Sequence, residues 1–239
     1  MKDYLHALAD YDQALQIKPK LAETLLNRGH VLRALGRFDA SLADFDEVVA
    51  LQPNYAAAHL GRAAMLQKLR RNQEASAACD EAIRLDPKFV NARTLRSMCR
   101  YSRGDWAGAL SDFDEAIRLD PKYALAHNGR ALVLSQAPDD RLRDGGKAVE
   151  SATRACELSG GKVPLYVLTL AFAQAEKGDF DAALVTLDKL DEILPPLAPL
   201  GVLRPELRKS YRAKTPLRIP FGGFPQGPFQ WVLPLPAIQ

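Results

Sequence analysis

The sequence has little of what would indicate a disulfide framework, a metal site or a membrane span. Its 239 residues include three cysteines, an odd number without CxxC spacing, so reduced cysteines in a core are expected. No apolar run approaches the roughly 18 residues that a membrane span needs, and the N-terminus lacks the apolar region of a secretory signal. We therefore expect a soluble, cytoplasmic protein.

An excess of charge of one sign is lacking too. Lys and Arg number 32 against 29 Asp and Glu, which leaves a formal net charge of +3. A nucleic-acid-binding domain carries a concentrated basic surface, so neither a nucleic acid nor a membrane partner is expected. Apolar residues make up 47% of the chain, which is enough to form a core and argues against a disordered protein.

Motifs of common enzymes are also missing. The sequence contains no GxxxxGK[ST], GxGxxG, GxSxG or HExxH pattern. The four histidines do not cluster with carboxylates or cysteines at metal-ligand spacing, and a packing role is expected for His59 and His127. Asp139 and Asp140 are interpreted as turn formers. The expectation is a chain that is not an enzyme and holds no cofactor or metal.

An internal repeat dominates what is present. Pro19, Pro53, Pro87 and Pro121 are each separated by 34 residues. Pro195 occupies the same repeat position two repeats after Pro121, once six inserted residues near 138–146 and before Pro164 are allowed for. The register predicts an orphan second helix at 1–21, repeats at 22–55, 56–89, 90–123, 124–163 and 164–197, a linker and short basic capping helix at 198–216, and a Pro/Gly/aromatic tail at 217–239.

Residues inside the repeats recur with the same period. Small residues stand at the start of each second helix, at Ala7, Ser41, Ala75, Ala109, Ala148 and Ala183, and Gly36, Gly104 and Gly178 mark the bends between helices. With these positions the chain resembles the tetratricopeptide repeat family over about residues 1–197. The resemblance implies an all-α fold, a right-handed superhelical solenoid of about five helix pairs.

Four arginines replace the leucine that the family usually has, and each stands sixteen residues after an aspartate. The pairs are Asp12 with Arg28, Asp46 with Arg62, Asp80 with Arg96, and Asp114 with Arg130. This spacing predicts a structural ladder between successive repeats, in which loss of one buried partner would cost about 3–5 kcal/mol. A stripe that binds phosphate or carboxylate ligands is the alternative interpretation.

The resemblance also implies a concave groove, lined by the first helices, that holds a peptide. The residues carried over are Asn27, His30, Arg33, Leu60, Ala64, Gln67, Thr94, Met98, Tyr101, Asn128, Leu132, Ser135, Leu168, Phe172 and Glu176. Tyr101 and Phe172 are the expected anchors, whereas Met98 and Leu132 could instead pack between helices. Only Asn27 fits the family's carboxylate clamp, so an apolar peptide is predicted in preference to an acidic tail.

The ends and the insertion carry further expectations. An orphan first helix predicts a fragment of a longer protein, a helix covered by another segment, or self-association through that helix. With Pro138, Asp139, Arg143, Asp144, Gly145, Ala148, Ala155, Cys156 and Glu157, residues 135–190 resemble the terminal repeats of bacterial tetratricopeptide proteins abundant in planctomycetes. In the larger proteins of that group, the repeats commonly follow a kinase-like or other enzymatic domain. The basic helix is interpreted as a solvated cap, and the aromatic tail either as flexible or as an extended segment in a groove.

The hypothesis that combines these features is a non-catalytic scaffold that binds a protein or peptide of unknown identity in its groove. Two alternatives stay open. One is a regulatory fragment of a larger signalling enzyme such as a kinase, and the other is a self-associating structural protein.

Overall fold

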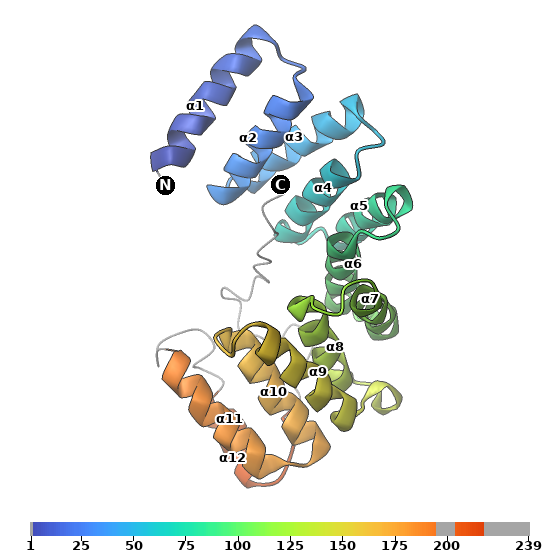
Figure 1. The fold of residues 1–239 in the computed structure, drawn as a ribbon, viewed down its shortest axis with the longest axis vertical. Coiled ribbons are helices and arrows are strands. Elements are labelled where there is room, and N and C mark those ends of the chain that lie inside the picture. The colour runs from blue at the N-terminus through green and yellow to red at the C-terminus, as the bar shows by residue number, and fades with distance from the viewer. Residues whose placement is uncertain (1, 195–203, 218–239) are drawn as a thin grey trace. The chain divides into compact units, whose positions relative to one another are not determined.

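The computed structural model describes residues 2–194 and 204–217, drawn as ribbon in Figure 1. Within these residues the regular structure is twelve α-helices and one short 3-10 helix, with no strand. Most of the linker after residue 197 and the tail after residue 217 lie outside the described residues, so the predicted path of the tail stays a prediction.

A first helix, α1 (Lys2–Ile17), is followed by five pairs of helices. The pairs are α2 (Ala22–Ala34) with α3 (Phe38–Leu51), α4 (Ala56–Lys68) with α5 (Asn72–Leu85), α6 (Val90–Ser102) with α7 (Trp106–Leu119), α8 (Ala124–Gln136) with α9 (Gly145–Leu158), and α10 (Pro164–Lys177) with α11 (Phe180–Ile193). The turn η1 (Asp140–Leu142) precedes α9, and α12 (Arg204–Arg212) closes the described chain. The predicted all-α fold of tandem helix pairs is confirmed.

The chain forms two compact units, Met1–Cys99 and Arg100–Gln239, called unit 1 and unit 2 below. In unit 1, Leu15, Leu25 and Val48 form one buried cluster, and Leu8 packs with Val31 and Leu32 in a second. Unit 2 has a larger cluster that joins α8, α10, α11 and α12. Because α12 contributes to this cluster, it covers apolar side chains of the last helix pair.

Side-chain volume is balanced between neighbouring repeats. A Cβ added at Gly61 would overlap the ring of Phe45, and a Cβ at Gly129 would overlap the ring of Phe113. Each glycine follows its phenylalanine by sixteen residues. At the same offset in the intervening repeat, Cys79 is followed by Leu95, and both are fully buried. A large residue on one helix is therefore matched by a small one on the next, as close packing requires.

The bends between helices use a left-handed residue. Gly36, Gly104 and Gly178 have φ of 75°, 81° and 89°, where glycine has no Cβ penalty. The corresponding residue of the second repeat is Arg70, with φ of 64°. A side chain in this conformation is strained by about 1–2 kcal/mol, so the bend of the second repeat is less favourable than the others.

The insertion between α8 and α9 is held by one arginine. Arg143 Nε donates to Glu176 Oε1 at 2.9 Å, and Arg143 Nη1 donates to the carbonyl oxygens of Ala137 and Pro138 at 2.8 and 3.1 Å. Asp144 then caps α9 by accepting from the backbone N–H of Lys147. The extra residues therefore connect α8 to α10 without interrupting the helix pair.

Candidate functional site

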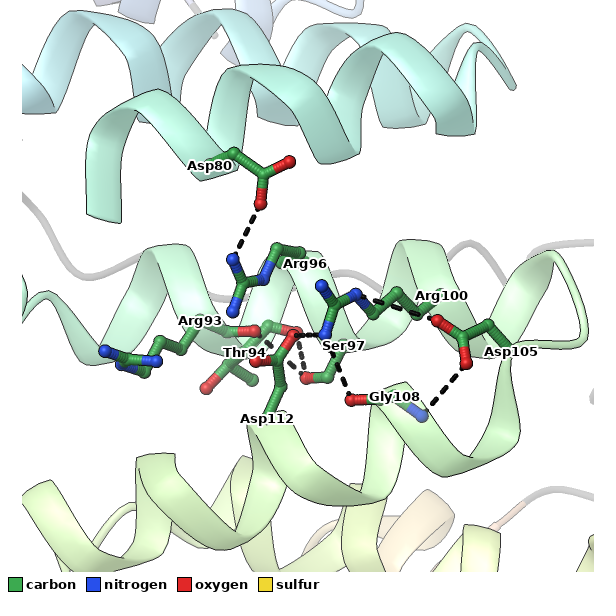
Figure 2. Close-up of polar contacts among 9 residues, drawn as sticks. All are labelled: Asp80, Arg93, Thr94, Arg96, Ser97, Arg100, Asp105, Gly108 and Asp112. Atoms are coloured by element: carbon green, nitrogen blue, oxygen red, sulfur yellow. Dashed lines mark hydrogen bonds and ion pairs between the residues drawn. The ribbon is translucent and has the colours of Figure 1, made fainter. Parts of the chain in front are cut away.

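The structure brings each ladder arginine to the aspartate sixteen residues before it. In unit 1, Arg28 Nη1 lies 2.8 Å from Asp12 Oδ1, Arg62 Nε lies 2.6 Å from Asp46 Oδ1, and Arg96 Nη1 lies 2.6 Å from Asp80 Oδ1. Figure 2 shows the last of these contacts, with Asp80 reaching from α5 to α6. In unit 2, Arg130 Nε donates to Asp114 Oδ1 at 2.7 Å.

The aspartates of these four contacts are half exposed. The side chains of Asp12, Asp46, Asp80 and Asp114 keep between 49% and 54% of their accessible surface. The expectation that the ladder consists of buried pairs is therefore wrong, and so is the cost of about 3–5 kcal/mol per pair. Water screens such pairs, and each is worth about 0–1 kcal/mol.

A second, buried carboxylate was missed by the sequence reasoning. Arg28 Nε and Nη2 donate to Asp44 Oδ2 and Oδ1 at 2.9 and 2.6 Å, and the Asp44 side chain is only 5% exposed. The hydrogen bonds to Asp44 raise the pKa of Arg28 further above its ordinary value. The signal was available, because Asp44 stands sixteen residues after Arg28.

Unit 2 also has a buried carboxylate at this repeat position, that of Asp112, which stands two periods of 34 residues after Asp44. Arg100 Nη1 lies 3.0 Å from Asp112 Oδ2. Figure 2 shows the same guanidinium approaching Asp105 and the carbonyl of Gly108. Arg130 in turn donates to Ser151 Oγ at 2.6 Å. These contacts tie helices of unit 2 together, and the charged side chains of the group are bonded to one another or to neighbouring polar groups.

Histidine and arginine side chains hold the proline turns. His59 Nε2 lies 2.8 Å from the carbonyl oxygen of Pro53, and His127 Nε2 lies 3.0 Å from that of Pro121. Arg93, at the same position of the intervening repeat, donates to the carbonyl of Pro87 at 3.0 Å. Each of these side chains therefore satisfies a turn carbonyl, which agrees with the packing role expected for the two histidines.

The predicted groove residues of unit 2 are buried among its helices. Leu132, Leu168 and Phe172 are 2%, 0% and 1% exposed and belong to one apolar cluster with Leu187 and Leu207. Asn128 and Ser135 are also fully buried. Tyr101 packs edge-on against Trp106, with ring centroids 4.5 Å apart, and burial raises its pKa. Glu176 is bonded to Arg143, as described above. Leu132, Leu168, Phe172, Asn128 and Ser135 are therefore not displayed as a binding surface needs, whereas Tyr101 and Glu176 keep part of their surface.

The predicted groove residues of unit 1 divide into two groups. Leu60, Ala64, Thr94 and Met98 are buried, with exposures of 5% or less. Asn27, His30, Arg33 and Gln67 are partly exposed, as is the adjoining Lys68. We call the set Asn27, His30, Arg33, Gln67 and Lys68 the first-helix face of unit 1.

The electrostatics of this face are those of a basic cluster. Partial burial lowers the pKa of His30 below its ordinary value of 6.5, and the charge of Arg33 lowers it further. Partial burial also lowers the pKa of Arg33 and of Lys68, and Arg33 adds to the effect on Lys68. Groups that lose hydration and repel one another favour their uncharged forms, which explains the common direction.

The described residues contain neither a candidate metal site nor a membrane-spanning helix. No group of three His, Cys, Asp or Glu among them could hold a metal ion, and none of their helices is long and apolar enough to cross a membrane. An open hollow lies along α7 beside Leu142, lined by Asp114, Glu115 and Arg118. Its charged side chains are already bonded, Asp114 to Arg130 and Glu115 to Arg118.

Comparisons with known proteins agree with this geometry. Tetratricopeptide repeat family models match residues 26–88 and 100–137. A solved tetratricopeptide protein of Thermus thermophilus is 25% identical, with a TM-score of 0.59 over 81% of this chain and 98% of its own. YrrB, described as a TPR protein with an unusual peptide-binding site, is 17% identical, with a TM-score of 0.60 over 82% of this chain and 97% of its own.

A third solved structure extends the likeness. PilW, described as a type IV pilus biogenesis factor, is 19% identical, with a TM-score of 0.72 over 84% of this chain and 91% of its own. At this identity the comparison concerns the fold alone. A comparison with curated proteins gives no match.

Proposed function

We propose, from the premise that the chain is a tetratricopeptide repeat protein, that it is a non-catalytic scaffold whose first-helix face of unit 1 holds an extended segment of a partner protein. The fold is that of protein-protein interaction scaffolds, which supports the general role. The description of YrrB includes a peptide-binding site, and we extend peptide binding to this chain as part of the proposal.

The observation that carries the proposal is the pair of amides at Asn27 and Gln67. Both are partly exposed, on α2 and α4, and neither side chain makes a hydrogen bond within the described residues. An amide offers one acceptor and two donors, which is what the backbone of an extended segment needs. The apolar peptide expected from the sequence is less suitable, because the apolar candidates are buried.

The test compares two double variants in affinity capture from lysate of the organism that makes the protein. Asn27→Ala with Gln67→Ala removes the amides of the first-helix face. Gln13→Ala with Gln73→Ala removes two exposed amides from α1 and α5 and is the matched control. We expect the control to retain the proteins captured by the parent chain and the first variant to lose them, with both variants melting like the parent.

The proposal fails if the Asn27→Ala, Gln67→Ala chain captures the same proteins in the same amounts as the parent. It also fails if both double variants lose them equally, because the loss would then not depend on the first helices. Turnover of a small molecule by the purified chain would contradict the non-catalytic role.

A further inference from the structure

Two buried polar side chains of unit 2 have no hydrogen-bond partner among the described residues. Asn128, on α8, is 0% exposed, and neither its Oδ1 nor its Nδ2 takes part in a hydrogen bond. Tyr211, on α12, is 1% exposed, and its hydroxyl is unbonded as well. Withdrawing an amide from water without a partner is unfavourable. Asn128 therefore favours a neighbour that offers both a donor and an acceptor.

Buried hydroxyl groups on the first helices of unit 2 differ from Asn128. Ser135 Oγ, on α8, donates to the carbonyl oxygen of Ala131 at 2.8 Å. Thr169 Oγ1, on α10, donates to the carbonyl oxygen of Leu165 at 2.9 Å. These hydroxyls are satisfied by the backbone of their own helix. The amide of Asn128 has one acceptor and two donors, and its own helix satisfies none of them.

Asn128 borders the large apolar cluster of unit 2. Leu132 follows it by one turn on α8 and belongs to this cluster together with Phe172 of α10. Leu217 packs against the same cluster and is the last residue that the structure describes. After α12 the chain therefore returns to the cluster that α8 and α10 share, and residue 218 is joined to it there.

The sequence that continues from Leu217 suits this surface. Residues 218–239, called the C-terminal segment below, contain five prolines, three glycines and four aromatic residues. Such a composition opposes a helix or a central strand and favours an extended backbone, whose peptide groups are free to bond to other side chains. At about 3.1 Å per residue the segment would span about 70 Å, several times the distance of about 10 Å between packed helices.

We propose that the C-terminal segment binds intramolecularly across the first helices α8 and α10 of unit 2. Peptide groups of the segment bond to the amide of Asn128, and its aromatic side chains pack on the apolar cluster. Because the segment is joined to unit 2 at Leu217, the contact is intramolecular and needs no high intrinsic affinity. The segment thereby excludes other proteins from the first helices of unit 2. This proposal goes beyond the proposed function, which concerns unit 1, and does not rest on it.

Photo-crosslinking within the full chain tests the proposal. The photoreactive amino acid p-benzoylphenylalanine is introduced at Phe224 and, in a separate chain, at Phe229. We expect an adduct with a peptide of α8 or α10, found by mass spectrometry in a product with the mass of one chain. The same amino acid at Val185, which is 55% exposed on α11, is the control and should give no such adduct.

Two results of this experiment would overturn the proposal. One is that neither position gives an adduct with α8 or α10. The other is that such adducts occur only in products with the mass of two chains, because a second copy would then be the occupant.

Two variants of α8 test the contact with Asn128. Asn128→Leu keeps a similar volume and removes the amide, whereas Ser135→Ala removes a hydroxyl that is already bonded within its helix. We expect Asn128→Leu to lower the yield of the intramolecular adduct about fivefold and Ser135→Ala to leave it within about twofold. Equal yields from both variants and the parent would refute the contact and the proposal.

Thermal melts of the same chains add a readout with opposite signs. If the C-terminal segment bonds to the amide, Asn128→Leu should melt below the parent chain, because the bonds are lost. A higher melting temperature would contradict the proposal, since replacing an unpartnered buried amide with an apolar side chain is stabilising. If Asn128→Leu does not fold, the crosslink in the chain with an unchanged α8 decides.

Discussion

The first helices of the two units place different side chains at one position of the repeat. This position is His30, Ala64 and Met98 in unit 1, and it is Leu132 and Phe172 in unit 2. His30 keeps part of its surface, whereas Ala64 and Met98 are 5% and 3% exposed and Leu132 and Phe172 are 2% and 1% exposed. The same backbone position can therefore present a side chain or bury it, and the residue and its covering decide which.

The covering in unit 2 comes from α12. Leu207 and Tyr211 are fully buried in the cluster that contains Phe172. Arg204 is bonded to Asp191, and Arg208 lies 2.7 Å from Asp188 and 2.6 Å from Asp191. Arg204 and Arg208 thus flank an apolar contact, which makes α12 a structural part of unit 2, whereas Lys209, Arg212 and Lys214 are exposed, as a solvated cap requires.

The largest expected effect is in unit 2. Phe172→Ala would leave a cavity in its core and should lower the free energy of unfolding by about 3–5 kcal/mol, measured by urea denaturation. Phe172→Leu, which keeps much of the volume, should cost clearly less. A loss below about 1 kcal/mol would mean that Phe172 is displayed as His30 is.

The next largest effect is the difference in stability lost when either of two carboxylates of unit 1 is removed. Asp44→Ala removes the buried partner of Arg28 and should destabilise the chain by about 2–3 kcal/mol, discounted because Arg28 is partly exposed. Asp46→Ala removes a half-exposed partner of Arg62 and should cost less than about 1 kcal/mol. Thermal melts of the two variants at low and moderate salt measure the difference. Equal losses would show that exposure does not rank these pairs.

A smaller effect concerns the bends. Arg70→Gly replaces the left-handed arginine of unit 1 with the residue that unit 2 has at Gly104 and Gly178, and it relieves the strain. We expect a gain of about 1 kcal/mol in the free energy of unfolding. As a control, Gly104→Arg should lose a similar amount. A destabilised Arg70→Gly chain would show that the arginine side chain contributes more than its strain.

The smallest effect is restricted to acid pH. Because the pKa of His30 is lowered in the folded chain, the unfolded chain takes up the proton first as the pH falls. The stability that neutral His30 contributes is therefore complete above about pH 6.5 and is lost below it. His30→Phe, which copies Phe172, should lose less stability than the parent between about pH 7 and pH 5. Parallel pH profiles of the two chains would remove His30 as the cause.

The sequence was sufficient to place the helices and the ladder contacts, because both depend on spacing. A period of 34 residues fixes which positions recur, and an offset of sixteen residues fixes which side chains of neighbouring repeats meet. Two further pairs in contact, Phe45 with Gly61 and Arg28 with Asp44, are also sixteen residues apart, so the same offset in the sequence would have predicted them.

Burial could not be derived in the same way. Phe172 and His30 share a register position, but Phe172 is buried in a cluster that includes Leu207 and Tyr211 of α12, a helix that the repeat does not specify. Likewise, the sequence could not distinguish the buried Asp44 from the half-exposed Asp46, although both follow the start of α3.

Photo-crosslinking locates the face of unit 1 that contacts a partner protein. The photoreactive amino acid p-benzoylphenylalanine is introduced at Gln67, on the first-helix face of unit 1, and separately at Gln73, on the exposed side of α5. We expect a discrete adduct with one partner protein from position 67 and none from position 73. An adduct of the same partner from position 73 alone, or in equal yield from both, would contradict it.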